Sequence, residues 1–279
     1  MTGKDAYQLV LTVLQPVYGE REAASMAKYL LEDSYSIHSI HSTQEVDNQQ
    51  LKRQLSLLKS GKPLAQVTGV AYFYNLKLEI NEEVLIPRPE TEELVEWGLQ
   101  SLQRMNLTNP RVLDVGTGSG CIALSIAQEA TAAQVMAIDV SEEALRLAQK
   151  NATNLELRVE FKELNALKKE DWESIPLQDL IISNPPYIPP SERVHMPDSV
   201  TNFEPDLALF TPEEDPMQFY RALAQWGQGR LRDRGEILVE GNEFRMDAVK
   251  QVFQAAGFAH TELRSDLQGK PRMLLATKA

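Results

Sequence analysis

Apolar residues in the first 60 positions recur every three or four residues, which is the spacing of one face of a helix. This pattern covers residues 7–14 and 20–31, and a third such stretch follows Asp47 and ends at Gly61. Asp47 is of a type that caps helix N-termini, and glycine commonly ends a helix. The pattern predicts a small helical domain over residues 1–62. Such a domain serves either as a stabilising appendage or as a module that recognises a substrate protein, and the pattern does not separate the two.

The period changes between residues 63 and 86. Apolar and polar residues alternate over residues 73–80, which is typical of a strand with one buried face. Gly69 and the pair Asn81-Glu82 bracket this stretch with residues that favour turns. We therefore expect a β-hairpin linker over residues 63–86.

The rest of the chain alternates short apolar runs with amphipathic stretches. Thr91 is expected to cap a helix that runs to about residue 105. Further helices are predicted at residues 121–130, 141–151, 219–231 and 246–256. Strands are predicted at residues 112–115, 134–139, 158–161, 179–183, 236–240, 261–264 and 273–277. This alternation predicts an α/β domain over residues 87–279, Rossmann-like, with a mostly parallel seven-stranded sheet.

Charge is distributed unevenly along the chain. The whole sequence has 28 Lys and Arg against 40 Asp and Glu, a net charge of −12. Residues 1–80 contain 8 of each sign, whereas residues 81–279 contain 20 basic and 32 acidic residues. An acidic body repels phosphate backbones, so we do not expect direct nucleic-acid binding, although a local basic patch is compatible with an acidic total.

Composition excludes several classes of protein. Apolar residues make up 43% of the chain and charged residues 24%, as in ordinary soluble domains. No apolar run approaches the roughly 20 residues of a membrane span, and the N-terminus has no signal-peptide pattern. The single cysteine, Cys121, cannot form an intramolecular disulfide, and the four histidines include no helical His-x-x-x-His pair. We therefore expect a cytoplasmic protein that has no metal site and needs no oligomer to function.

A glycine-rich loop follows the strand predicted at residues 112–115. It reads Asp114-Val-Gly-Thr-Gly-Ser-Gly120, and its glycines permit a tight turn and a close approach of backbone to ligand. The spacing of these glycines differs from the Gly-x-Gly-x-x-Gly fingerprint of dinucleotide sites. The carboxylate of Asp114 suits a cofactor with a positively charged methionine end. Asp139, 25 residues after Asp114, ends the next strand and can accept hydrogen bonds from a ribose. These features favour S-adenosylmethionine; NAD and a ligand-free turn are the alternatives.

The strand predicted at residues 179–183 ends in Asn184-Pro185-Pro186-Tyr187. Ligands of open α/β sheets bind outside the carboxyl ends of the strands, which places this tetrapeptide in the active site. The side-chain oxygen of Asn184 and the carbonyl of Pro185 can accept the two hydrogens of an –NH₂ group. Tyr187 offers a flat face for a planar amide or base.

This arrangement suits methylation of a poorly nucleophilic nitrogen. The lone pair of an amide or an exocyclic amine is delocalised into its π system. Two acceptors that hold the N–H bonds favour a more tetrahedral nitrogen, whose lone pair points at the methyl group. The remaining requirement is alignment for an in-line displacement, so no strong base is needed at the start.

The two motifs together resemble the Rossmann-like amino-methyltransferases, which modify adenine N6 in DNA, guanine N2 in RNA or glutamine N5 in proteins. Residues 86–92 (Ile-Pro-Arg-Pro-Glu-Thr-Glu), residues 184–188 and the Phe-Glu-Pro of residues 203–205 narrow the resemblance to the release factor glutamine methyltransferase family. The order of a short helical domain, a β-hairpin and a catalytic domain is similar as well. The nucleic-acid amino-methyltransferases remain the alternative.

The resemblance implies S-adenosyl-L-methionine as methyl donor and S-adenosyl-L-homocysteine as product. It implies class 1 peptide chain release factors as protein substrate, methylated at N5 of the glutamine in their Gly-Gly-Gln motif, with an effect on translation termination. The implied catalytic residues are Asn184, Pro185, Pro186 and Tyr187. The implied cofactor-binding residues are Asp114, Gly116, Thr117, Gly118, Ser119, Gly120, Asp139, Asn165 and Asn184.

The adenine contact is where the sequence departs from the family. An acidic or aromatic residue is usual near the end of the third strand, and here Asn165 takes that position while Trp172 is expected to pack in the core. Arg88 is either an entrance residue or an ordinary surface arginine, and Glu204 is expected to lie behind the site. His195 is expected to be a solvated loop residue.

Overall fold

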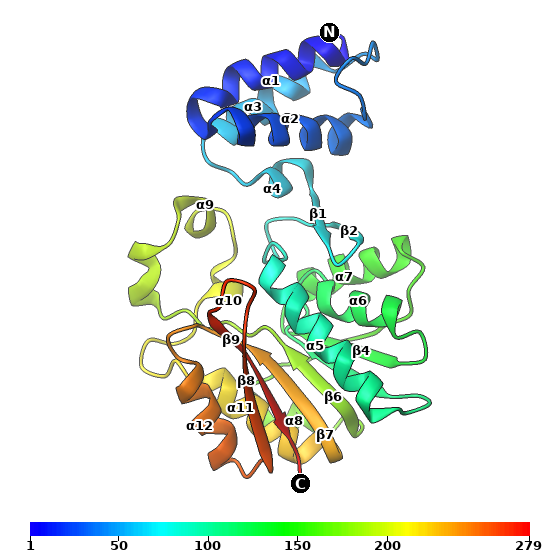
Figure 1. Ribbon diagram of the computed structural model, residues 1–279, viewed down its shortest axis with the longest axis vertical. Coiled ribbons are helices and arrows are strands. Elements are labelled where there is room, and N and C mark those ends of the chain that lie inside the picture. The colour runs from blue at the N-terminus through cyan, green and yellow to red at the C-terminus, as the bar shows by residue number, and fades with distance from the viewer.

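The computed structural model describes residues 1–279. Its first 60 residues form a compact bundle of three helices, α1 (Gly3–Tyr18), α2 (Glu20–Tyr35) and α3 (Asn48–Lys59), at one end of the molecule (Figure 1). Thirteen buried apolar side chains, from Ala6 to Leu58, form a core of the bundle's own. The cap predicted at Asp47 is confirmed, because Oδ1 of Asp47 accepts hydrogen bonds from the backbone N–H groups of Gln49 and Gln50.

A short helix and a β-hairpin connect the bundle to the sheet domain (Figure 1). They are α4 (Leu64–Thr68), β1 (Val70–Phe73) and β2 (Leu76–Glu79), with β1 and β2 antiparallel. The expected β-hairpin is therefore present, but the alternation over residues 73–80 spans its turn and is not a single strand. Tyr74 and Asn75 have positive φ values of 45° and 65°, the conformation of a two-residue hairpin turn.

Seven strands form the main sheet: β3 (Arg111–Val115), β4 (Gln134–Asp139), β5 (Glu160–Glu163), β6 (Gln178–Ser183), β7 (Leu231–Glu240), β8 (His260–Ser265) and β9 (Pro271–Thr277). Their order is β5-β4-β3-β6-β7-β9-β8. All of them run in the same direction except β9, which is antiparallel to β7 and to β8. The predicted Rossmann-like fold with a mostly parallel sheet is confirmed. The carboxyl ends of β3, β4, β6 and β7 consequently lie along one edge.

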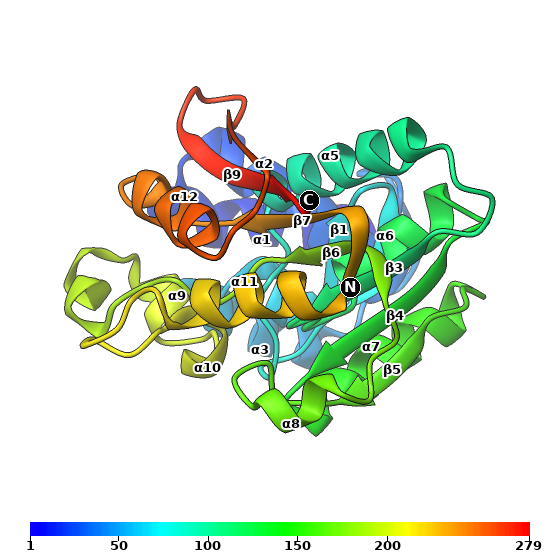
Figure 2. The same ribbon diagram turned by 90° about the horizontal axis from the view of Figure 1, so that it is seen from below.

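Helices cover both faces of this sheet. One face is covered by α5 (Pro89–Met105), α6 (Cys121–Glu129) and α7 (Glu142–Asn154). The other face is covered by α8 (Lys169–Trp172), α11 (Gln218–Arg230) and α12 (Met246–Ala255). Figure 2 shows α5 and α11 on opposite sides. The two large apolar clusters of the domain match this division, since one includes α5 and α6 and the other includes α11 and α12.

Three short helical segments lie between β6 and α11, and the sequence periodicity did not predict them. They are the 3₁₀ helix η1 (Pro190–His195), α9 (Asp198–Thr201) and α10 (Asp206–Leu209). Each is too short to show a helical repeat. A side-chain hydrogen bond from Gln66 Nε2 to the Phe203 carbonyl, 2.6 Å, joins this insertion to α4.

Several predicted boundaries were wrong, and the largest error is at β7, which begins at Leu231 and not at residue 236. Thr91 is not the cap of α5, because the helix begins two residues earlier with Arg88 in the cap position. The strand predicted at residues 158–161 is β5, two residues later. None of the helices is both long and apolar enough to cross a membrane.

Candidate active site

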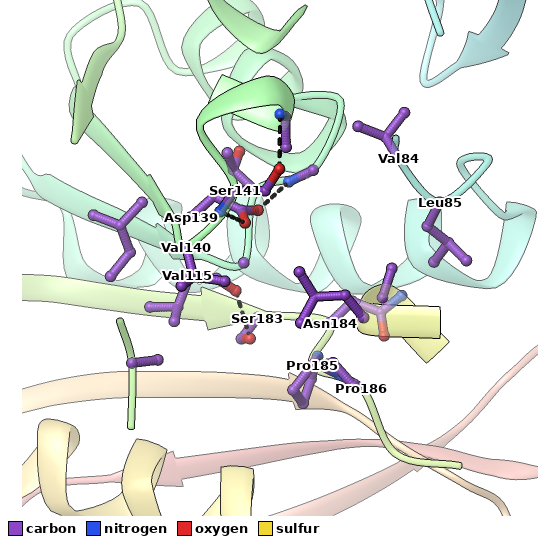
Figure 3. A pocket seen from close by; sticks show the side chains of 18 of the residues that line it. Val84, Leu85, Val115, Asp139, Val140, Ser141, Ser183, Asn184, Pro185 and Pro186 are labelled. Carbon is purple, nitrogen blue, oxygen red and sulfur yellow. Dashed lines mark hydrogen bonds between the residues drawn. The ribbon is translucent and has the colours of Figure 1, made fainter. Parts of the chain in front are cut away.

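A cavity of about 240 Å³ opens at the carboxyl edge of the sheet. Its lining comes from the loop after β3, the ends of β4, β5 and β6, the segment before α5, and parts of α10 and α11. Figure 3 shows Asp139 and Ser141 on one side of the cavity and Asn184, Pro185 and Pro186 on another. The cavity therefore brings together the glycine-rich loop and the Asn-Pro-Pro motif, which lie about 70 residues apart in the sequence.

The glycine-rich loop adopts a conformation that only glycine takes readily. Gly116, Gly118 and Gly120 have φ values of 75°, 54° and 86°. A Cβ at Gly116 or Gly118 would meet no other atom within 4 Å, so the glycines leave open space beside the backbone. The backbone N–H groups of Gly116 and Thr117 both donate to the carbonyl of Ile138, which fixes the turn against β4.

Asp139 connects the end of β4 to this loop. Its Oδ2 accepts a hydrogen bond from Gly118 N at 2.9 Å, and its Oδ1 accepts one from Ser141 N at 3.0 Å. Burial raises the pKa of Asp139, and the hydrogen bonds from the backbone oppose that rise. Each carboxylate oxygen keeps a further lone pair, so Asp139 can hold the loop and still accept hydrogen bonds from a ligand.

Asp114 lies beneath the loop and does not line the cavity. Its Oδ2 accepts hydrogen bonds from Thr117 Oγ1 at 2.6 Å and from Ala123 N at 3.2 Å. Its Oδ1 is buried and has no hydrogen-bond partner. Complete burial raises the pKa of Asp114 to about 7. In this geometry, the carboxyl group supports the loop and the start of α6.

The segment after β5 forms another wall of the cavity. Asn165 Oδ1 accepts a hydrogen bond from Leu167 N at 2.8 Å, so the amino group of Asn165 is the part available to a ligand. The carbonyl of Ala166 accepts hydrogen bonds from the indoles of both Trp172, at 3.2 Å, and Trp226, at 3.0 Å. The two rings lie 4.9 Å apart in the core, and Trp172 therefore supports this wall from behind, as a packing residue.

The Asn-Pro-Pro-Tyr motif divides between the cavity and the layer behind it. Asn184, Pro185 and Pro186 line the cavity, whereas Tyr187 does not. The hydroxyl of Tyr187 donates a long hydrogen bond, 3.4 Å, to Glu240 Oε1, and burial raises its pKa. The hydroxyl of Ser183, one residue before the motif, donates to the carbonyl of Val115 at 2.7 Å and ties β6 to β3 (Figure 3).

Sequence reasoning missed two residues that contact this motif. Asn184 Nδ2 donates to Thr91 Oγ1 at 3.0 Å, and Thr91 Oγ1 donates to Glu240 Oε2 at 2.7 Å. Burial raises the pKa of Glu240 to about 7, although Thr91, Arg272 and Tyr187 lower it. The sequence shows only that Glu240 is an acidic residue at the carboxyl end of an apolar strand; the structure adds that this strand lies next to β6.

An ion pair closes the side of the cavity near α5. Arg88 lines the cavity and pairs with the completely buried carboxylate of Glu204. Glu204 also accepts a hydrogen bond from Ile86 N at 3.0 Å. The pair fixes the Pro-Arg-Pro segment to the insertion, which agrees with an entrance position for Arg88 and a supporting position for Glu204. His195 is exposed at the end of η1.

Most of the residues predicted to bind a cofactor meet at this cavity. Those that line it are Gly116, Thr117, Gly118, Ser119, Asp139, Asn165 and Asn184; Asp114 and Gly120 do not. Ser119 Oγ is buried without a partner, and the glycines leave space beside the backbone. These features fit a nucleoside cofactor with a polar amino-acid end. Burial raises the pKa of the Cys121 thiol to about 12, which favours the neutral thiol.

Comparison with known proteins agrees with this geometry. Residues 98–196 match a family model described as "Methyltransferase small domain". A release factor glutamine methyltransferase of Flavobacterium psychrophilum is 37% identical over 269 residues, covering 94% of each chain. One of Enterococcus faecalis is 36% identical over 275 residues, covering 98% of this chain and 93% of that protein.

Solved structures share the fold at lower identity. A methyltransferase from Pyrococcus furiosus is 16% identical with a TM-score of 0.53, and the match covers 82% of this chain and 98% of that one. The hMettl16 catalytic domain, solved in complex with an RNA hairpin of the MAT2A 3′UTR, is 18% identical with a TM-score of 0.56. That match covers 82% of this chain and 80% of the other.

Proposed function

This chain belongs to the family of release factor glutamine methyltransferases, and we propose that it methylates N5 of the glutamine in the Gly-Gly-Gln motif of class 1 release factors with S-adenosylmethionine as donor. The observation that carries the proposal is the single cavity shared by the glycine-rich loop and the Asn184-Pro185 pair. A donor site and an amide-binding site must adjoin if a methyl group is to pass directly between them.

The cofactor half of the cavity supplies the binding groups. Gly116 and Gly118 would let the backbone approach the methionine end, Asp139 would accept the ribose hydroxyls, and the amino group of Asn165 would face the adenine. When bound, S-adenosylmethionine supplies an electrophilic methyl group on a cationic sulfur. The buried hydroxyl of Ser119 is free for a further polar contact.

The substrate half of the cavity supplies hydrogen-bond acceptors for the glutamine amide. The Asn184 side-chain oxygen and the Pro185 carbonyl would accept the two hydrogens of the glutamine –NH₂ group, because no group of the protein donates a hydrogen bond to either oxygen. Held by two acceptors, the nitrogen can direct its lone pair along the line of displacement. The methylated nitrogen would release its proton to water after the transfer, so the reaction needs no strong base at the start.

We also propose a division of labour along the chain, with residues 1–62 as a substrate-recognition domain, residues 63–86 as linker and residues 87–279 as the methyltransferase domain. The bundle has its own core, and the first 80 residues carry no net charge, which suits contact with a folded protein. We place the activity in the cytoplasm, where release factors act on the ribosome.

The test is a methyl-transfer assay with labelled S-adenosylmethionine and purified release factor. We expect label on the wild-type factor and none on a factor whose Gly-Gly-Gln glutamine is replaced by alanine. Label on RNA or DNA, and none on either factor, would contradict the proposal and favour a nucleic-acid amino-methyltransferase. Cofactor binding measured by calorimetry is the control that the protein is folded and competent.

A further inference from the structure

The side-chain amide of Asn184 can be used in two opposite ways. Rotation by 180° exchanges its oxygen and its amino group, which occupy nearly the same volume. Only the oxygen can accept a hydrogen of the substrate amide. With its amino group toward the substrate, Asn184 would place hydrogen-bond donors against the N–H donors of the substrate amide and could not bind them. Something in the protein must therefore select one orientation.

Two buried residues behind Asn184 provide that selection. Its Nδ2 donates to Thr91 Oγ1 at 3.0 Å, and the hydroxyl of Thr91 donates in turn to Glu240 Oε2 at 2.7 Å. An ionised carboxylate accepts hydrogen bonds and cannot donate them, so it takes the hydroxyl hydrogen of Thr91. The Thr91 oxygen is then left as an acceptor, which only the amino group of Asn184 can satisfy.

Both positioning residues are shielded from water, since Thr91 and Glu240 are each 2% exposed. A buried polar group that loses its partner is costly, and the wrong rotamer of Asn184 would set its oxygen against the Thr91 oxygen. The register of the sheet fixes the arrangement, because Ser183 lies opposite Val239, and the residues that follow them in the chain are Asn184 and Glu240.

We propose that Glu240, acting through Thr91, is a positioning residue that turns the amide oxygen of Asn184 toward the substrate. The inference rests on the proposed function for what the oxygen binds, but the orientation is a property of the free protein. Glu240 also accepts a hydrogen bond from the Tyr187 hydroxyl at 3.4 Å, so this carboxylate binds the last residue of the Asn-Pro-Pro-Tyr motif directly and the first through Thr91. The Tyr220 hydroxyl fixes the backbone of Glu240 by donating to its carbonyl at 3.0 Å.

The charge of Glu240 makes the arrangement sensitive to pH. The groups facing this carboxyl are Arg272 on β9, Glu90 on α5, the thiol of Cys121 on α6, and the phenols of Tyr187 and Tyr220. Burial raises its pKa to about 7. Once protonated, Glu240 can donate to Thr91, whose own hydrogen is then free to turn toward Asn184 and stabilise the reversed amide.

Nuclear magnetic resonance of the free, full-length protein reads the orientation directly. The amino signals of Asn184, assigned by their loss in Asn184→Asp, are expected to shift in Thr91→Val, which removes the hydroxyl at nearly constant shape. They are also expected to titrate with a midpoint near pH 7 in the wild type and not in Glu240→Gln. Thr153→Val, at an exposed threonine of α7, is the matched control and should leave the signals unchanged.

Steady-state kinetics tests the consequence for catalysis. Thr91→Val is expected to lower kcat about 100-fold, the order expected for a misplaced reacting group, with the cofactor Kd within about threefold. Thr91→Ser keeps the hydroxyl and should stay within about threefold of the wild-type kcat. The positioning role would be overturned by a wild-type kcat in Thr91→Val. It would also be overturned if the Asn184 signals were the same in Thr91→Val and Glu240→Gln as in the wild type. A wild-type protein that shows the expected signals but methylates no factor would instead refute the proposed function and leave the positioning intact.

Discussion

The two halves of the cavity are built in different ways. The cofactor half is made mainly of backbone, from one glycine-rich turn and the end of the neighbouring strand, and Gly118 and Asp139 are only 21 positions apart. The substrate half is made of side chains brought together from afar, since Asn184 bonds Thr91 at a separation of 93 residues and Thr91 bonds Glu240 at 149. Binding of the cofactor thus depends on local conformation, and handling of the substrate amide depends on how the whole sheet is assembled.

The difference predicts that substitutions in the two halves separate binding from catalysis. The largest effect is expected for Asn184→Ala, which removes the acceptor from the substrate half. We expect kcat to fall about 1000-fold, as for loss of a group that acts in the transition state, while the cofactor Kd changes only a few-fold. Kinetics with purified release factor and calorimetry with the cofactor measure the two quantities. Asn154→Ala, at an exposed position, is the control, and full activity in Asn184→Ala would contradict amide gripping.

One carboxyl group with a strongly raised pKa lies behind each half, Asp114 beneath the glycine-rich loop and Glu240 behind Asn184, and pH should reveal both. The pKa values of Asp114 and Glu240 are raised to about 7 by burial, so the folded protein holds protons that the unfolded chain releases near pH 4. The stabilisation is complete below the unfolded pKa and is lost as pH rises from about 4 to 7. At about 1.4 kcal/mol for each unit of pKa, the free energy of unfolding should fall by roughly 4 kcal/mol for each group.

Denaturant unfolding between pH 5 and 7.5 measures this slope. Asp114→Asn and Glu240→Gln should each flatten it, because each substitution removes one titrating group from one half of the cavity. Equal slopes in the wild type and both variants would mean that the carboxyl groups titrate normally.

The cofactor half should respond to Asp139→Ala with weaker binding. The substitution removes the acceptor of Gly118 N and Ser141 N together with the ribose contact. We expect the cofactor Kd to rise about 30-fold, the order of a lost charged hydrogen bond, with kcat at saturating cofactor within a few-fold. Asp233→Ala, at an exposed position on β7, is the control. A fall in kcat with an unchanged cofactor Kd would contradict the assignment of Asp139 to cofactor binding.

The smallest effect is expected from the helical bundle, which lies outside both halves. Deletion of residues 1–62 should raise the apparent KM for the whole release factor about tenfold, the loss of a modest contact, and leave the KM for a short Gly-Gly-Gln peptide unchanged. The cut must precede the hairpin, because Phe73 is buried in the main core of the sheet domain. Equal changes for factor and peptide would make the bundle purely structural.

The sequence by itself determined the features that depend on residues close together along the chain. The helices of the bundle, the alternation of strand and helix, the cap at Asp47, the glycine-rich turn and the Asn-Pro-Pro-Tyr motif all follow from local periodicity and from the conformations that glycine and proline allow. The strand order and the short helices of the insertion do not. Strand order depends on which apolar faces meet, and a four-residue helix has no repeat to detect.

Only the tertiary structure assigned Thr91 and Glu240 to the site. In the sequence Thr91 reads as a helix cap and Glu240 as the last residue of a strand, and nothing local links them to Asn184. The pairing of β6 with β7 and the position of α5 over this edge bring the three side chains within hydrogen-bond distance. A hydrogen bond acts over about 3 Å of space whatever the separation along the chain. The hydrogen bonds that join Asn184, Thr91 and Glu240 therefore exist only once the sheet has formed.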